Sequence, residues 1–424
     1  MSDEDTAAPL VMEDLPGVLK LLSDGSVVRG DEAVLWPKDP LPDVPGVQWK
    51  DALYHAPRGL SVRVYRPSSP VKTAGGPKLP VLVYFHGGGY CLGSFAQPHF
   101  HTYCLRAAAE LPAVVLSVQY RLAPEHRLPA AIQDGAAFLS WLRDQAELGV
   151  GADLWLAESA DFGRTFISGA SAGANLAHHV TVQAASAQED VHPVRLAGYV
   201  LISAFFGGAE RTETEADPPA DVSLTVEGSD MFWRMSLPVG ASRDHPVTNP
   251  FGPESPSLAS VDLPPVLVVA PESDVLRDRV MGYAATLREM GKAVEVAEFA
   301  GEQHGFSVLR PFGEAANELM RVLKRFVYTS TLSNTTQPDE PFDGLSVRRI
   351  ELHSESERDL KTLCEMFCAV SLVMLRAQRS LMPNGEIVAK KEAEVTNMSS
   401  PTAYMPTAVA AGSGYLKAVS QEVG

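Results

Sequence analysis

The chain has 424 residues, which excludes a small disulfide-stapled scaffold and leaves room for one large α/β domain with extensions. Hydrophobic residues make up 45% of the chain and charged residues 21%, so the composition is that of a folded globular protein. The formal net charge is -17 at pH 7, and this acidic excess repels phosphate backbones and anionic lipids. We therefore expect neither a nucleic acid nor a membrane as a partner.

The cysteine count, the N-terminal sequence and the length of the apolar runs indicate the cellular compartment. The chain has only 4 cysteines, and its N-terminal sequence, MSDEDTAAPL, lacks the basic and then apolar pattern of a signal peptide. The mainly apolar run 366–375 is about half of the roughly 20 residues that span a bilayer. These features predict a protein of the cytoplasm or nucleus without a transmembrane helix.

Short apolar runs alternate with longer helix-like segments along the chain. The short runs predict strands over residues 60–65, 81–85, 113–118, 165–168, 197–202, 265–270 and 294–299. The longer segments predict helices over residues 99–110, 129–145, 172–185, 278–290 and 314–328. Because strands that take turns with helices form βαβ units, the fold class is α/β, with a mostly parallel central sheet and helices on both faces.

Two segments break this alternation. Residues 205–256, called the cap segment below, are rich in Gly, Pro, Asp and Thr, and we expect them to leave the sheet and cover a pocket. Residues 331–424 follow the last predicted helix, begin with a polar linker and form a C-terminal extension that we expect to be partly helical and partly disordered. The α/β domain then spans residues 51–330, after an N-terminal arm of residues 1–50.

The motif Gly169-Ala170-Ser171-Ala172-Gly173 follows a predicted strand and precedes a predicted helix. A serine at such a turn has a strained backbone and presents its hydroxyl outward, while the flanking glycines let the strand and the helix approach each other. Gly, Ala and Ser are common residues, so the pattern also arises by chance. Its place between a strand and a helix favours Ser171 as a nucleophile.

A second motif, His86-Gly87-Gly88-Gly89-Tyr90, ends the strand predicted over 81–85. Successive glycines leave backbone N–H groups unobstructed, so Gly88 and Gly89, with the amide of Ala172, are predicted to form an oxyanion hole. The alternative is a flexible glycine turn without a chemical role. We expect His86 to orient the loop rather than to react.

A serine hydroxyl needs a base, and the sequence supplies an acid and a histidine after it in the order that this type of site uses. Asp274 and His304 each follow a predicted parallel strand, at the sheet edge where such folds gather their active sites. We expect His304 to take the proton of Ser171 and Asp274 to orient the imidazole. Asp278 and Glu272 are rivals for the acid, unless they only pair with a helix N-terminus.

The remaining histidines and cysteines carry weaker signals. His99 follows the glycine loop closely enough to touch a ligand, whereas His178 and His179 are more simply explained as packed or solvated helix residues. No set of His, Cys and carboxylates has metal-ligand spacing, and Cys364-x-x-x-Cys368 lacks a second pair. We predict no metal and no cofactor.

Taken together, the motifs resemble those of the plant carboxylesterases, in the hormone-sensitive-lipase-like branch of the α/β-hydrolase superfamily. The resemblance covers about residues 9–328. It rests on the motifs HGGGY, YRLAPEHRLP, GASAG, SDVLRD and QHGF, and on FWR and RDHP, which are typical of the plant members. Residues 98–101 and 205–208 further resemble a plant subgroup that includes strigolactone-cleaving esterases.

This resemblance implies a serine carboxylesterase with the α/β-hydrolase fold, whose arm, residues 1–50, folds over the pocket as a lid. The implied partner is a small-molecule ester, such as a plant hormone or specialised-metabolite ester, strigolactone among them, and the implied state is a monomer or homodimer. We assign Tyr90, His99, Phe232 and Trp233 to the substrate pocket.

Two other functions stay open from the sequence. The family also contains gibberellin receptors, which resemble esterases but lack the catalytic histidine, and the presence of His304 argues against a pure receptor. It further contains hydroxyisoflavanone dehydratases, lyases that use a similar pocket and similar groups. The sequence alone does not separate a lyase from a hydrolase.

Overall fold

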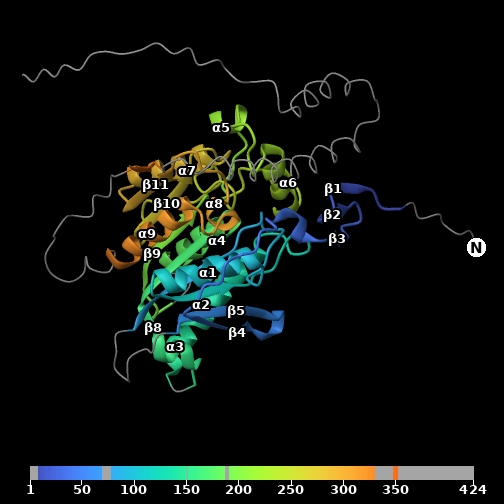
Figure 1. Cartoon of the computed structure of the whole chain (residues 1–424). Coiled ribbons are helices and arrows are strands. Elements are labelled where there is room, and N and C mark those ends of the chain that lie inside the picture. Colours follow the sequence, from blue (N-terminus) through green and yellow to red (C-terminus); the bar gives the residue numbers. More distant parts are fainter. Residues whose placement is uncertain (1–7, 69–77, 150, 187–190, 330–346, 352–424) are drawn as a thin grey trace, which may run out of the picture. The chain divides into compact units, whose positions relative to one another are not determined.

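The computed structural model describes residues 8–68, 78–149, 151–186, 191–329 and 347–351. A large central sheet runs through these residues and carries helices on both faces (Figure 1). Its strands pair in parallel from β12 to β7, and antiparallel where β5 meets β7 and β4. In spatial order they are β12 (Val347–Ile350), β11 (Val294–Phe299), β10 (Val266–Pro271), β9 (Leu196–Ile202), β8 (Ala160–Ala170), β6 (Leu79–Phe85), β7 (Val114–Val118), β5 (Leu60–Pro67) and β4 (Val47–His55).

The central strands are apolar on both sides because helices cover both faces of the sheet. In β6, Val81, Val83 and Phe85 belong to one hydrophobic cluster, whereas Leu82 and Tyr84 belong to the other. Successive side chains of a strand point to opposite faces, so a continuous apolar run fits a doubly covered strand. This is the physical reason why the short apolar runs predicted the strands.

The helices divide between these two clusters. Residues of α1 and α9 pack on one face, and residues of α2, α4 and α7 pack on the other. The helices are α1 (Pro98–Glu110), α2 (Ala130–Leu148), α3 (Leu154–Ser159), α4 (Ala172–Ala185), α5 (Glu213–Ala216), α6 (Val226–Ser236), α7 (Arg277–Glu289), α8 (Phe306–Leu309) and α9 (Glu314–Thr329), with short 3₁₀ turns η1 (Glu32–Leu35) and η2 (Ala56–Arg58).

The predicted α/β class is confirmed, and every predicted strand and helix overlaps an observed element. None of the helices in the described ranges has both the length and the apolar character that a bilayer crossing requires.

The N-terminal arm forms a separate small antiparallel sheet of β1 (Val11–Leu15), β2 (Leu19–Leu22) and β3 (Val27–Arg29). Its buried residues cluster with residues of the glycine loop region and of α6: Leu15, Val18, Leu19, Cys91, Leu92, Ala123, Met231 and Met235. Arg29 fastens the arm further by donating to the carbonyl oxygens of Cys91 and Ala123 at 2.8 and 2.9 Å. The arm therefore packs beside the predicted oxyanion loop, and its action as a lid stays a prediction.

The extension predicted over 331–424 lies outside the described residues, except for residues 347–351. Residues 347–350 form β12, which pairs in parallel with β11 at the edge of the large sheet. Arg349 of this strand donates to Glu272 at 2.7 Å, and Glu272 lies just after β10. The end of the α/β domain at residue 330 stays a prediction. The strand β12 lies after that boundary in the chain and still pairs with the sheet of the domain.

Candidate active site

Ser171 occupies a sharp turn between β8 and α4. Its backbone has φ 54 and ψ -121, a conformation that non-glycine residues rarely adopt. The end of β9 and the residues after it hold this turn, because the Ser171 N–H donates to the Ile202 carbonyl at 2.9 Å and the Ser171 carbonyl accepts from the Phe205 N–H at 3.1 Å. Ser171 remains partly exposed while the residues around it on β8 and α4 are buried. The strained turn therefore presents the hydroxyl toward solvent.

Gly173 shows why the motif needs glycine after the serine. A Cβ built on Gly173 would lie 2.0 Å from the backbone oxygen of Phe85, closer than real Cβ contacts come. The helix α4 can lie this close to the end of β6 only without a side chain at that position.

We predict that Gly173→Ala lowers the free energy of unfolding by about 3 kcal/mol or more, because backbone rather than a flexible side chain blocks the new methyl group. Gly282→Ala is the matched control: Gly282 lies in α7 and has open space around its Cβ position. Alanine there should stabilise the protein by about 0.5–1 kcal/mol through helix propensity. Urea unfolding measures both, and equal effects would contradict the packing argument.

His304 and Asp274 lie in the loops that follow two neighbouring parallel strands, β11 and β10. The imidazole Nε2 is 2.9 Å from the Ser171 Oγ, and Nδ1 is 2.8 Å from the Asp274 Oδ2. Because a carboxylate accepts hydrogen bonds, Nδ1 carries the proton and Nε2 is left to accept from the serine hydroxyl. The structure thus brings the three sequence-predicted residues into one hydrogen-bonded chain.

Asp274 is itself held in place. Its side chain is fully buried, and its second oxygen, Oδ1, accepts from the Leu276 N–H at 3.0 Å. Both carboxylate oxygens therefore have partners, as a buried charge requires. The orientation of Asp274 is fixed by the turn that leads into α7.

The rival carboxylates have other partners. Asp278 accepts from the Thr214 N–H at 2.8 Å, and although burial alone raises its pKa, the hydrogen bonds from Thr214 bring the pKa below the usual value. Glu272 accepts from the Gly301 N–H at 2.8 Å, which lowers its pKa, and it also pairs with Arg349. Of the three carboxylates considered, Asp274 is the one that contacts His304.

The glycine loop lies beside the serine. A Cβ built on Gly87 would come within 3.1 Å of the Ser171 Cβ, so the loop backbone approaches the hydroxyl closely. The N–H groups of Gly88, Gly89 and Ala172 make no hydrogen bond to another described residue. These three donors are therefore free to bind an oxygen that a ligand brings.

His86 supports this loop from inside. Its ring stacks on Tyr120 with centroids 4.4 Å apart, its Nδ1–H donates to the Gly87 carbonyl at 2.7 Å, and its own carbonyl accepts from the Tyr120 hydroxyl. Burial lowers the pKa of His86 to about 4, so the ring is neutral at pH 7. The expected role of His86 in orienting the loop agrees with this placement.

Two predicted pocket residues have covered side chains. The Tyr90 hydroxyl donates to the Asn175 Oδ1 at 2.6 Å, and Trp233 stacks on Phe205 with centroids 4.2 Å apart. Both rings are almost fully buried, with 1% of each residue exposed. Both side chains belong to the hydrophobic core, and direct contact with a substrate stays a prediction for them.

The other two pocket residues lie in different places. Phe232 is half-buried, and a Cβ on Gly89 would come within 2.4 Å of its ring, so it packs directly on the glycine loop. His99 stacks on Trp36 at 5.3 Å and lines a cavity of about 350 Å³ between residues 37–42 and 309–314. Neither Ser171 nor His304 lines that cavity.

Asn175 is a structural residue of the site that the sequence did not single out. Its Nδ2 donates to the carbonyl oxygens of Phe205 and Val247 at 3.0 and 2.8 Å, while its Oδ1 accepts from Tyr90. It therefore joins α4, the glycine loop and the cap segment just one helical turn after Ser171. Its signal in the sequence is an amide in the first turn of a helix that is rich in alanine.

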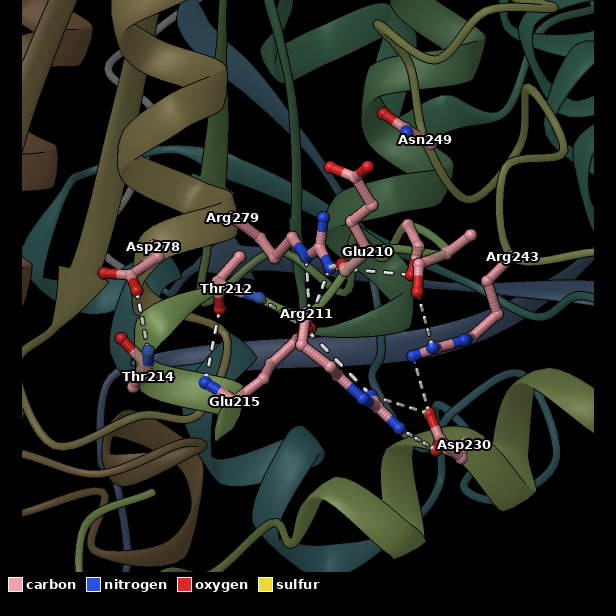
Figure 2. A network of polar contacts seen from close by, with 12 residues as sticks. Glu210, Arg211, Thr212, Thr214, Glu215, Asp230, Arg243, Asn249, Asp278 and Arg279 are labelled. Carbon is pink, nitrogen blue, oxygen red and sulfur yellow. Dashed lines mark hydrogen bonds and ion pairs between the residues drawn. The ribbon is translucent and has the colours of Figure 1, made fainter. Parts of the chain in front are cut away.

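A polar network fastens the cap segment to α7 (Figure 2). Arg279 of α7 donates to both carboxylate oxygens of the buried Glu215 on α5, at 3.1 and 2.8 Å. Asp230 of α6 accepts from Arg211 and also from Arg243 at 2.9 Å. Because α7 begins at Arg277, this network ties the cap segment to the helix that follows the buried Asp274.

Among the described residues, no group of three or more His, Cys, Asp or Glu side chains could hold a metal ion. His178 and His179, in α4, bond to the Tyr283 hydroxyl at 2.9 Å and to the Val247 carbonyl at 3.0 Å, and burial lowers the pKa of both. They act as packed histidines, as the sequence favoured.

Comparison with known proteins adds to this geometry. The family model described as alpha/beta hydrolase fold matches residues 82–308. Carboxylesterase 20 of Arabidopsis thaliana is 36% identical over 298 residues, covering 69% of this chain and 88% of that protein. The 3-O-acetylpapaveroxine carboxylesterase CXE2 of Papaver somniferum is 36% identical over 308 residues, covering 70% and 96%.

A solved structure agrees with these relatives. The esterase of Pyrobaculum calidifontis superposes with a TM-score of 0.56 at 29% sequence identity, and the match covers 68% of this chain and 86% of that one. These two sequence relatives and this solved structure are all esterases by name.

Proposed function

Because the chain belongs to the alpha/beta hydrolase family and is a carboxylic ester hydrolase, we propose that Ser171, His304 and Asp274 are its catalytic triad. The observation that supports this most is the continuous chain of hydrogen bonds from the Ser171 Oγ through the imidazole to the Asp274 carboxylate. A fold alone does not decide chemistry, whereas this arrangement of a nucleophile, a base and an orienting acid has a defined use.

In the proposed first step, the Ser171 Oγ attacks the ester carbonyl carbon while its proton passes to the His304 Nε2. The carbonyl oxygen becomes an oxyanion, and the free N–H groups of Gly88, Gly89 and Ala172 donate to it. When the intermediate collapses, the bond to the leaving oxygen breaks and Nε2 returns the proton to that oxygen. The alcohol leaves and an acyl group remains on Ser171.

In the proposed second step, a water molecule attacks the acyl group on Ser171 as the serine attacked the ester. His304 takes one proton of the water, the hydroxyl oxygen attacks the acyl carbon, and the proton finally returns to Ser171 as the carboxylic acid leaves. Asp274 keeps its charge throughout and stabilises the imidazolium that forms twice in each turnover. The fully buried carboxylate suits this role because water does not screen its charge.

We propose small esters of plant hormones or specialised metabolites as the substrates. The name of the Papaver relative states that it acts on an acetylated compound, which supports an ester with a small acyl group. Strigolactone belongs to the same proposal through the resemblance of residues 98–101 and 205–208 to a plant subgroup. Phe232, half-buried against the glycine loop, is the pocket residue best placed to contact such a substrate.

The test is hydrolysis of p-nitrophenyl acetate, followed by inactivation with a p-nitrophenyl alkylphosphonate. We expect turnover, release of about one p-nitrophenolate per chain by the phosphonate, and a phosphonyl adduct on Ser171 in peptide mass spectra. In that reaction the Oγ forms a bond to phosphorus while the bond to p-nitrophenolate breaks. A strigolactone analogue and an acetylated alkaloid then compare the substrate classes.

A folded protein that shows neither turnover nor an adduct would contradict the triad. Binding of gibberellin by that protein would then favour a receptor, and loss of water from a hydroxyisoflavanone would favour a lyase. An adduct on another serine would likewise overturn the assignment of Ser171.

A further inference from the structure

The cap segment contacts the loop that carries His304. The Ser223 hydroxyl donates to the His304 carbonyl at 2.7 Å, so a residue more than eighty positions earlier in the chain holds the main chain of the histidine. This loop lies between the end of β11 and the four-residue helix α8, and Gly305 follows His304 with a left-handed φ of 76. His304 lies in a loop and not within a long helix or strand. Its position therefore depends more strongly on the hydrogen bonds that its loop makes.

Gln303 makes a second connection next to the first. Its Oε1 accepts from the Ser223 N–H at 3.0 Å, and its Nε2 donates to the Asp221 carbonyl at 2.9 Å. One amide side chain thus binds the backbone on both sides of Val222, as a neighbouring strand would. Two hydrogen bonds of Gln303 and one accepted by the His304 carbonyl therefore join this loop to the cap segment.

The cap segment also binds the α/β domain at α7 and at Ser171. The Arg279–Glu215 pair ties it to α7, the helix that follows Asp274 in the chain (Figure 2). Its first residue, Phe205, donates its N–H to the Ser171 carbonyl. The segment that would cover the substrate therefore contacts Ser171, the loop of His304 and the helix that follows Asp274.

We propose that Ser223 and Gln303 are positioning residues, which keep the His304 imidazole aligned with Ser171 by binding its loop to the cap segment. The proposal rests on the proposed function, since it concerns the histidine of that triad. A misplacement of about 1 Å at a catalytic group costs up to about a hundredfold in rate, so such contacts affect turnover without touching the substrate.

Ser223→Ala removes the hydrogen bond to the His304 carbonyl. We expect kcat on p-nitrophenyl acetate to fall about tenfold with KM changed by less than about twofold, and labelling of Ser171 by the phosphonate to slow in parallel. Ser223→Thr keeps a hydroxyl and should restore most of the rate. The matched control is Ser255→Ala: Ser255 also donates from the cap segment to a backbone carbonyl, that of Asn249, and we expect kcat to stay unchanged.

Gln303→Met removes the other two hydrogen bonds at similar side-chain volume, and we expect a comparable loss of kcat. Because both residues hold the same loop, the double variant should lose much less than the product of the two single effects. Thermal unfolding of each variant shows whether the fold is kept. A kcat in Ser223→Ala equal to that of the wild type, or equal losses in Ser223→Ala and Ser255→Ala, would overturn the proposal.

The two proposals fail in different ways. If Ser171→Ala is inactive and Ser223→Ala turns over at the wild-type rate, the positioning role is wrong and the triad stands. If Ser171→Ala keeps wild-type turnover, the triad is wrong and the positioning role is overturned with it.

Discussion

Ser171→Ala is expected to reduce kcat/KM for p-nitrophenyl acetate by at least about 10⁴-fold, because no other group replaces the attacking oxygen. The residual rate would come from the oxyanion donors and from water activated by His304. The fold should be kept, since alanine is smaller than serine and, within the described residues, the Oγ hydrogen-bonds to the imidazole alone. Steady-state hydrolysis and circular dichroism of the variant measure the two properties.

Ser168→Ala is the matched control for this substitution. Ser168 lies in β8 just before the turn, and its Oγ is buried without a hydrogen-bond partner in the structure. Loss of that hydroxyl should leave turnover within about twofold of the wild type, as expected where no hydrogen bond is broken. Activity in Ser171→Ala close to that of Ser168→Ala would remove Ser171 from the mechanism.

Much of this site could be predicted because its residues follow parallel strands with clear apolar signals. The runs at β8, β10 and β11 are buried on both faces, so their ends were evident in the sequence. Ser171 follows β8 directly, and Asp274 and His304 lie in the short loops after β10 and β11. Parallel strands end at one edge of the sheet, so residues far apart in the chain were expected to meet there.

Other features had no such signal. The edge strand β4 is half polar, and most of its residues are exposed or half-buried. The strand β12 has only four residues, two of them arginines. Neither strand therefore shows a continuous apolar run. The contact between Ser223 and Gln303 depends on the path of the cap segment, which local patterns do not define. Burial of Trp233 against Phe205 likewise follows from that path.

Replacement of the carboxylate that contacts His304 is expected to give the second large loss of activity. Asp274→Asn is expected to lower kcat by about 10³- to 10⁴-fold, since an amide nitrogen facing Nδ1 would favour the tautomer with the proton on Nε2, which cannot accept from Ser171. The Leu276 N–H can still donate to the remaining amide oxygen, so the turn before α7 should persist. Hydrolysis of p-nitrophenyl acetate and the thermal midpoint are measured together.

Asp278→Asn is the matched control, because it changes the same type of side chain four residues later, in the first turn of α7. Asp278 binds the Thr214 N–H of the cap segment and not the imidazole, and an asparagine oxygen can accept that bond. Its kcat should therefore stay within about threefold of the wild type. The reverse order of effects would mean that Asp278 reaches His304 in the working enzyme, and since the Arg279–Glu215 pair holds the start of α7, this would require that helix to move.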